Sequence, residues 1–289
     1  VLIALEKMRQ ALIQADDDKA RRAAEVAEKN AQLQAAHQQI QDELEIARTL
    51  QISILPTHFP NVGHCQLYAQ MEPAREMGGD FYDMFSIGQD HLGLVMADVS
   101  GKGVPAAFFM AVSRTQLRGI ARNGDSPEAV LAQLNDHLCE QNPLELFVTV
   151  FYALLNTRTG ELIYANGGHN PPLLQRGDSM ISLPTSGGMA LGIMPELPYQ
   201  QHRLQLDAGD RLFMFTDGVT EAFDIENQLF GEDRLEALLR EHRTEDTQQL
   251  IETVMTQLHH FSQGRPLADD ITCMALDFIP SVRSRYAAD

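Results

Sequence analysis

The chain has 289 residues, a hydrophobic content of 44% and a formal net charge of −18. This length suits one large domain with an appendage, and the negative charge repels phosphate backbones, which argues against nucleic-acid binding. Three widely spaced cysteines without a CxxC pair (Cys65, Cys139 and Cys273) argue against a disulfide framework and a zinc site, and they are typical of a reducing, cytoplasmic compartment.

Residues 1–55 contain neither glycine nor proline and are rich in helix-forming residues. Residues at seven-residue intervals are mostly apolar, although this pattern weakens in the middle of the segment. They are Leu5, Leu12, Lys19, Val26, Leu33, Ile40, Ala47 and Ile54. This spacing predicts a long helix in a parallel coiled coil, hence a homodimer, and the alternative is a single helix docked on the following domain.

The sequence begins at Val1, inside this helical pattern, so we expect a fragment of a longer protein from which an upstream sensor domain is missing. A membrane anchor in that missing part stays open. The sequence itself has no signal peptide and no apolar run of the roughly 18 residues that a membrane span requires.

A second domain is predicted at 62–279, followed by a short tail at 280–289, because the pattern changes to short strands and helices after two prolines. The strands predicted are 92–97, 147–155, 161–165, 211–216 and 271–279, and the helices are 104–122, 126–142, 232–242 and 246–262. Strands in hairpins and helices in pairs favour an α+β layered domain over a regular βαβ alternation.

Four short acidic motifs lie far apart in this domain, and each is read as ending a buried strand. They are residues 78–83 (GGDFYD), 97–103 (ADVSGKG), 216–219 (TDGV) and 268–272 (ADDIT). Strand ends can bring remote residues together, and clustered carboxylates are costly unless cations neutralise them. Mg²⁺ and Mn²⁺ prefer oxygen ligands, so the motifs together predict a two-metal hydrolytic site.

Each motif offers particular ligands. Asp98 can bridge two metals while the carbonyl of Val99 binds one, although a structural turn is the alternative and the P-loop frame is missing around its Gly-Lys-Gly. Asp80 follows a glycine pair, and Asp217 follows an apolar strand. Of the two acids that begin the final strand, Asp269 and its neighbour, only one should point into the site, because side chains alternate along a strand.

His169 lies in a glycine-rich loop at 165–172 (ANGGHNPP). A lone histidine in such a loop either orders the loop through hydrogen bonds or touches substrate. No serine has histidine and aspartate partners at a recognisable spacing, so a serine-hydrolase triad has no support.

Taken in order, the four motifs, the end of the first helix (45–51) and the segment 164–174 (YANGGHNPPLL) resemble the PPM family of metal-dependent serine/threonine phosphatases, in its bacterial SpoIIE/RsbU-like branch. The resemblance covers roughly residues 42–278. It implies a β-sandwich of two antiparallel sheets flanked by helices, with two Mn²⁺ or Mg²⁺ ions.

Carried over residue by residue, the resemblance makes Asp98 the bridging carboxylate with the Val99 carbonyl beside it. Asp217 and Asp269 resemble ligands of one metal, and Asp80 supports the other. Asp270 falls where many members have asparagine, so the choice between Asp269 and Asp270 stays open. The histidine proposed as general acid in eukaryotic members has no counterpart here, and Arg75 is the nearest candidate for a phosphate clamp.

The function implied is hydrolysis of phosphoserine or phosphothreonine on a regulatory partner in a bacterial signalling pathway, with a STAS-type anti-sigma-factor antagonist as substrate. The alternative is a catalytically inactive, dimeric partner-switching module, which the loss of a ligand carboxylate would favour. All four motifs keep their carboxylates. A two-metal nuclease is disfavoured by the negative charge.

Overall fold

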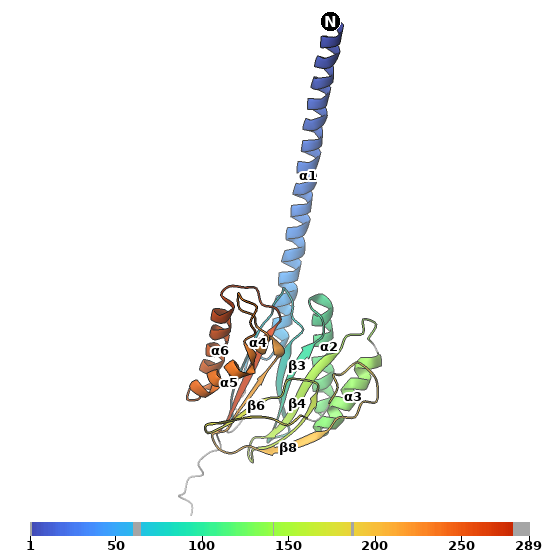
Figure 1. The fold of residues 1–289 in the computed structure, drawn as a ribbon. Helices are drawn as coiled ribbons and strands as arrows, with labels where there is room; N and C mark the ends of the chain where they lie inside the picture. The colour runs from blue at the N-terminus through green and yellow to red at the C-terminus, as the bar shows by residue number, and fades with distance from the viewer. Residues whose placement is uncertain (1, 60–64, 141, 186–187, 280–289) are drawn as a thin grey trace, which may run out of the picture. The chain divides into compact units, whose positions relative to one another are not determined.

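The computed structural model describes residues 2–59, 65–140, 142–185 and 188–279 (Figure 1). The chain divides into two compact units, Val1–Thr49 and Leu50–Asp289, and the boundary falls within the first helix, α1 (Leu2–Ile54). The domain start predicted at 62 and the tail predicted at 280–289 lie outside the described residues.

Helix α1 is continuous, as expected of a segment without glycine or proline. The apolar residues of its seven-residue spacing are exposed along the first unit, with Leu33 at 68% and Ile40 at 56%. None of the described residues of this unit covers them. In the described part of the chain, no helix combines the length and the apolar character needed to cross a membrane.

The last turn of α1 belongs to the second unit and is fixed to it. Gln51 is buried, and its side-chain amide donates to the carbonyl of Gly78 (2.6 Å) and accepts from the Gly78 N–H (3.1 Å). Leu55, directly after the helix, is buried in the main core. The helix end is therefore attached to the loop that precedes Asp80.

The described strands of the second unit form two sheets of five, and every paired strand is antiparallel. The first sheet has the order β1 (Cys65–Glu72), β10 (Ile271–Phe278), β9 (Arg211–Phe215), β6 (Leu173–Arg176), β7 (Ser179–Ser182). The second has the order β2 (Phe81–Ile87), β3 (His91–Val99), β4 (Val148–Asn156), β5 (Glu161–Gly167), β8 (Gln201–Gln205). The predicted pair of antiparallel sheets is confirmed.

Helices flank the sheets (Figure 1). Helices α2 (Val104–Ala121) and α3 (Pro127–Glu140) pack on the second sheet, and α6 (Thr247–Ser262) packs on the first, next to α5 (Gly231–Glu241) and the short α4 (Asp217–Thr220). Strand β9 shows why two layers form: Leu212 and Met214 join the core that contains the second sheet, whereas Phe213 and Phe215 pack with α5 and α6.

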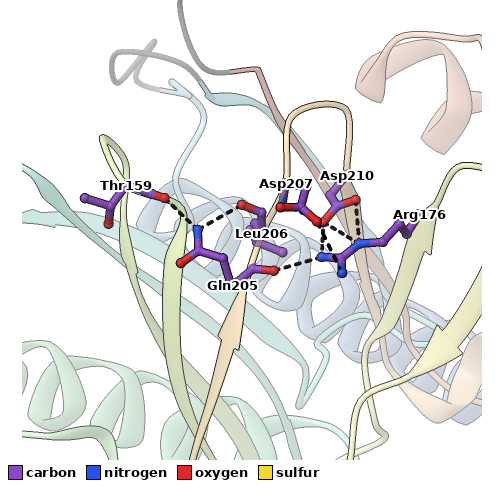
Figure 2. Close-up of polar contacts among 6 residues, drawn as sticks. All are labelled: Thr159, Arg176, Gln205, Leu206, Asp207 and Asp210. Atoms are coloured by element: carbon purple, nitrogen blue, oxygen red, sulfur yellow. Dashed lines mark hydrogen bonds and ion pairs between the residues drawn. The ribbon is translucent and has the colours of Figure 1, made fainter.

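A polar network holds the chain where β9 begins (Figure 2). Asp210 is 3% exposed, and Arg176 donates to both of its carboxylate oxygens (3.1 Å from Nε). The same guanidinium donates to the carbonyl of Gln205, whose side chain donates to the Thr159 carbonyl. The network thus joins β6 and β9 of one sheet to β8 of the other, at the end of β9 remote from Asp217.

Replacing Arg176 by alanine is expected to lower the free energy of unfolding by about 2 kcal/mol, because Asp210 would stay buried without its charged partner. Urea unfolding measures the change. The matched control is Arg158→Ala, which removes an exposed ion pair with Asp90 (3.5 Å) and should cost less than about 0.5 kcal/mol. Equal losses in the two variants would contradict this role of Arg176.

Candidate metal centre

The antiparallel pairing brings the four acidic motifs to one end of both sheets. In the second sheet, Phe81 pairs with Ala97, so Asp80, before β2, lies next to Asp98, near the end of β3. In the first sheet, the end of β9 pairs with the start of β10, which places Asp217 near the 268–272 motif. The expectation that each motif ends a strand is wrong for the first and last motifs, which lead into the starts of β2 and β10. They converge nonetheless, because antiparallel neighbours start where their partners end.

Two threonines hold Asp80 and join the sheets. The hydroxyls of Thr216 and Thr272, both from the first sheet's motifs, donate to Asp80 Oδ2 at 2.7 and 2.6 Å. The Thr272 N–H in turn donates to Thr216 Oγ1 (3.1 Å). Asp80 is 2% exposed, so these bonds fix one carboxylate of the second sheet against the first. Sequence reasoning missed both threonines, although each lies beside an acidic motif.

The electrostatics of the cluster show an excess of negative charge. Burial, then repulsion by Asp217, raises the pKa of Asp98 to about 7, and a hydrogen bond with Asp80 offsets part of this rise. Burial followed by repulsion from Asp98 raises the pKa of Asp80 as well. The pKa of Asp217 is raised by burial, Glu221 and Asp269. Carboxylates that destabilise one another's ionised forms in this way would be stabilised by a nearby cation.

Asp269 and Asp270 face different partners. Asp270 is 7% exposed and accepts from three backbone N–H groups, those of Ala74 (2.8 Å), Gly79 (2.6 Å) and Asp80 (3.4 Å). Asp269 is more exposed and pairs with Lys102 at 2.7 Å. Asp270 therefore orders the loop before β2, and we predict that Asp269 is the ligand of the two.

We expect Asp270→Ala to lower the free energy of unfolding by about 2–3 kcal/mol, because it leaves buried backbone N–H groups without an acceptor. Asp269→Ala should change stability by less than about 0.5 kcal/mol and instead weaken Mn²⁺ binding. Urea unfolding and calorimetric Mn²⁺ titration of both variants test the assignment. It is contradicted if Asp269→Ala is the less stable variant.

Val99 closes β3 and is 2% exposed. Its carbonyl oxygen faces Gly79 so closely that a Cβ there would lie 2.8 Å from it. Glycine at position 79 thus lets the first and second motifs approach. This contact places the Val99 carbonyl beside the loop that carries Asp80, as the proposed ligand role requires.

The two residues predicted to bind substrate lie in different surroundings. His169 is 5% exposed, and its backbone N–H donates to Asn166, while its Nδ1 lies 2.9 Å from the Thr149 hydroxyl, which donates to the Asp98 carbonyl (3.4 Å). Burial lowers the pKa of His169 to about 3, so its ring is neutral near pH 7. This setting favours the loop-ordering alternative. Arg75 is exposed and follows Ala74, in the loop before β2 whose N–H groups donate to Asp270. Its role in substrate binding stays a prediction.

Within the described ranges, no three of the His, Cys, Asp and Glu side chains lie closely enough to hold a metal ion in their present positions. The donor chemistry nevertheless fits hard divalent cations: the convergent groups are carboxylates, and their ionised forms are destabilised by mutual repulsion. The Lys102–Asp269 pair and the Asp80–Asp98 hydrogen bond already engage these oxygens. Binding of divalent cations would therefore require a rearrangement of side chains.

Comparison with known proteins agrees with this geometry. Residues 88–279 match the family described as stage II sporulation protein E (SpoIIE). The chain is 32% identical over 247 residues to the phosphoserine phosphatase RsbU of Bacillus subtilis, covering 84% of this chain and 72% of RsbU. It is 31% identical over 261 residues to protein IcfG of Synechocystis, covering 81% of this chain but only 41% of IcfG.

Solved structures show the same fold. The SiaA-PP2C domain of Pseudomonas aeruginosa superposes with a TM-score of 0.76 at 23% identity, covering 84% of this chain and 99% of that domain. RsbX, solved in complex with magnesium, superposes with a TM-score of 0.57 at 16% identity, covering 78% of this chain and all of RsbX.

Proposed function

The chain belongs to the SpoIIE family of PP2C-type phosphatases, and on that premise we propose that it hydrolyses phosphoserine or phosphothreonine on a protein partner, with two Mn²⁺ or Mg²⁺ ions. The observation that carries the proposal is the convergence of Asp80, Asp98, Asp217 and Asp269 at one end of both sheets, with a pKa of about 7 for Asp98. Such a cluster is suited to cations and disfavours any anionic ligand that arrives without them.

The proposed roles follow from the contacts. Asp98, Asp217 and Asp269, with the Val99 carbonyl, would hold the cations, and Asp80 would support them from its buried position between Thr216 and Thr272. Bound divalent cations supply positive charge that lowers the pKa of water and neutralises phosphate oxygens. The protein's part is to fix the carboxylates, which it does for Asp80 through hydrogen bonds that cross from one sheet to the other.

We propose a phosphorylated STAS-type anti-sigma-factor antagonist as the partner, on the strength of the resemblance to the RsbU-like branch. The test incubates the full chain with such a phosphoprotein and, in parallel, with p-nitrophenyl phosphate, in Mn²⁺, Mg²⁺ or EDTA. Phosphate release from both substrates that requires metal is expected. Release from the aryl phosphate alone would reject the STAS partner. Absence of release from both would reject the phosphatase and favour an inactive partner-switching module.

We also propose that the chain forms a parallel homodimer through the first unit. The exposed apolar residues at seven-residue intervals along α1 support this proposal. Leu33→Asp places a charge in the seam and should weaken the dimer at least about 30-fold, or roughly 2 kcal/mol. Sedimentation equilibrium gives the association constant. Gln34→Asp is the control, because its position lies outside the seam, and it should leave the dimer intact. A monomeric wild-type chain would contradict the coiled coil.

A further inference from the structure

We propose that Lys102 is the internal counter-ion of the carboxylate cluster, holding Asp269 until a divalent cation takes that carboxylate, and that its released ammonium group then binds the phosphate of the substrate. The second step rests on the proposed phosphatase function. The first concerns cation binding alone. No such role was predicted for Lys102 from the sequence. Its Gly-Lys-Gly segment resembles part of a P-loop, but the rest of the P-loop motif is missing.

The contacts of Lys102 join the second motif to the fourth. Its Nζ lies 2.7 Å from Asp269 Oδ2 and also donates to the carbonyl of Ala268. The same positive charge lowers the pKa of Asp217, which burial and its acidic neighbours raise. One lysine thus interacts with two of the four carboxylates assigned to the cations.

The backbone around Lys102 is specified by glycines. Gly101 and Gly103 have φ values of +85° and +77°, in the region that other residues rarely adopt. Lys102 lies between them in the loop from β3 to α2. This loop directly follows Asp98 and Val99, the last two residues of β3. The loop that directly follows the strand of Asp98 therefore carries a cationic side chain.

Lys102 and a divalent cation compete for the same oxygen, because Asp269 Oδ2 already accepts from the ammonium group and because the two positive charges repel. Two arginines of α2, Arg114 and Arg118, pair with Asp83 instead, at 3.1 and 3.6 Å. Cation binding to the cluster should therefore displace Lys102 from Asp269.

A displaced lysine at this position suits a phosphate group. The side chain is one-third exposed, so it can turn without unfolding the loop. An ammonium group on a four-carbon stem binds phosphate as a mobile point charge with three donors. Lys102 is therefore a candidate for the phosphate-binding role predicted for Arg75 from the sequence, and it lies within the cluster.

The test measures two binding constants on the full chain. Calorimetry gives the Kd for Mn²⁺ with metal-free protein, and equilibrium dialysis of radiolabelled inorganic phosphate in saturating Mg²⁺ gives the Kd for phosphate. Lys102→Gln should bind Mn²⁺ at least about 5-fold more tightly and phosphate at least about 10-fold more weakly. Lys102→Arg, which keeps the charge, should stay closer to wild type in both. Lys29→Gln removes a more exposed lysine–glutamate pair in α1 (3.1 Å), remote in sequence from the cluster, and should change neither.

The opposite signs of the two changes separate this proposal from simple damage, which would weaken both constants. Unchanged or weaker Mn²⁺ binding in Lys102→Gln overturns the counter-ion role, and unchanged phosphate binding overturns the phosphate role. Lys102→Ala repeats the test if the glutamine variant fails to fold. If Lys102→Gln shows both shifts but the wild-type chain releases no phosphate from phosphoproteins, the proposed function is rejected, and with it the binding of a substrate phosphate by Lys102. The counter-ion role of Lys102 would stand.

Discussion

Replacing Asp98 by asparagine is expected to lower kcat/KM for metal-dependent phosphoester hydrolysis by at least about 10³-fold. Asp98 interacts with Asp217, Asp80 and Asp269 at once, so it is the carboxylate at the centre of the cluster. An amide keeps the shape but loses the negative charge that would hold two cations. The measurement is initial-rate kinetics with p-nitrophenyl phosphate across a Mn²⁺ titration, so that weakened metal binding is distinguished from lost turnover.

The free energy of unfolding of the same variant provides a control, and the raised pKa of Asp98 determines the direction of its change. In the folded protein the pKa of Asp98 is raised from 3.8 to about 7, so the folded state binds more protons than the unfolded state between these values. This group therefore destabilises the metal-free protein progressively as the pH rises through that window. Metal-free Asp98→Asn should be at least as stable as wild type at about pH 8 in urea unfolding. A folded variant that keeps more than about a tenth of wild-type kcat/KM in saturating Mn²⁺ would reject the central role of Asp98.

The acidic motifs were predictable because carboxylates followed or preceded apolar runs, and such runs are the strongest local signal in a sequence. Local pattern does not show whether the first motif begins or ends a strand, because β2 has no clear strand signal in the sequence. In β2 five consecutive residues are buried, so the alternation that marks a half-exposed strand is missing. Strands β7 and β8 are short, polar and at sheet edges, where little burial distinguishes them from loops.

The partners of the carboxylates were harder to find than the carboxylates themselves. Thr216 and Thr272 bind an aspartate more than a hundred residues away, and Lys102 pairs with Asp269 at a similar separation. Neither contact follows from local pattern, since both depend on the register of β9 against β10 and on the loop after β3. The different surroundings of Asp269 and Asp270 also needed the structure, because they depend on the backbone N–H groups of a distant loop and on Lys102.

The close approach of β10 to α4 gives the second large effect, for Gly218→Ala. A Cβ at position 218 would lie 2.0 Å from the carbonyl oxygen of Asp270 and 2.9 Å from its carbonyl carbon. Both are backbone atoms, so they cannot rotate away as a side chain would. Relief requires the segment of Asp217 to separate from that of Asp269. We expect a loss of about 2–3 kcal/mol in the free energy of unfolding and at least about 10²-fold in kcat/KM.

Gly119→Ala is the matched control, because Gly119 lies in α2 and a Cβ there would have nothing within 4 Å. Alanine in a helix should leave activity unchanged and stabilise the protein by up to about 1 kcal/mol. The contrast between two identical substitutions isolates the effect of the backbone contact from that of losing a glycine. If Gly218→Ala unfolds at the wild-type urea concentration and keeps wild-type turnover, Asp217 and Asp269 do not depend on this contact, and the two sheets must hold the cluster through the Asp80 threonines alone.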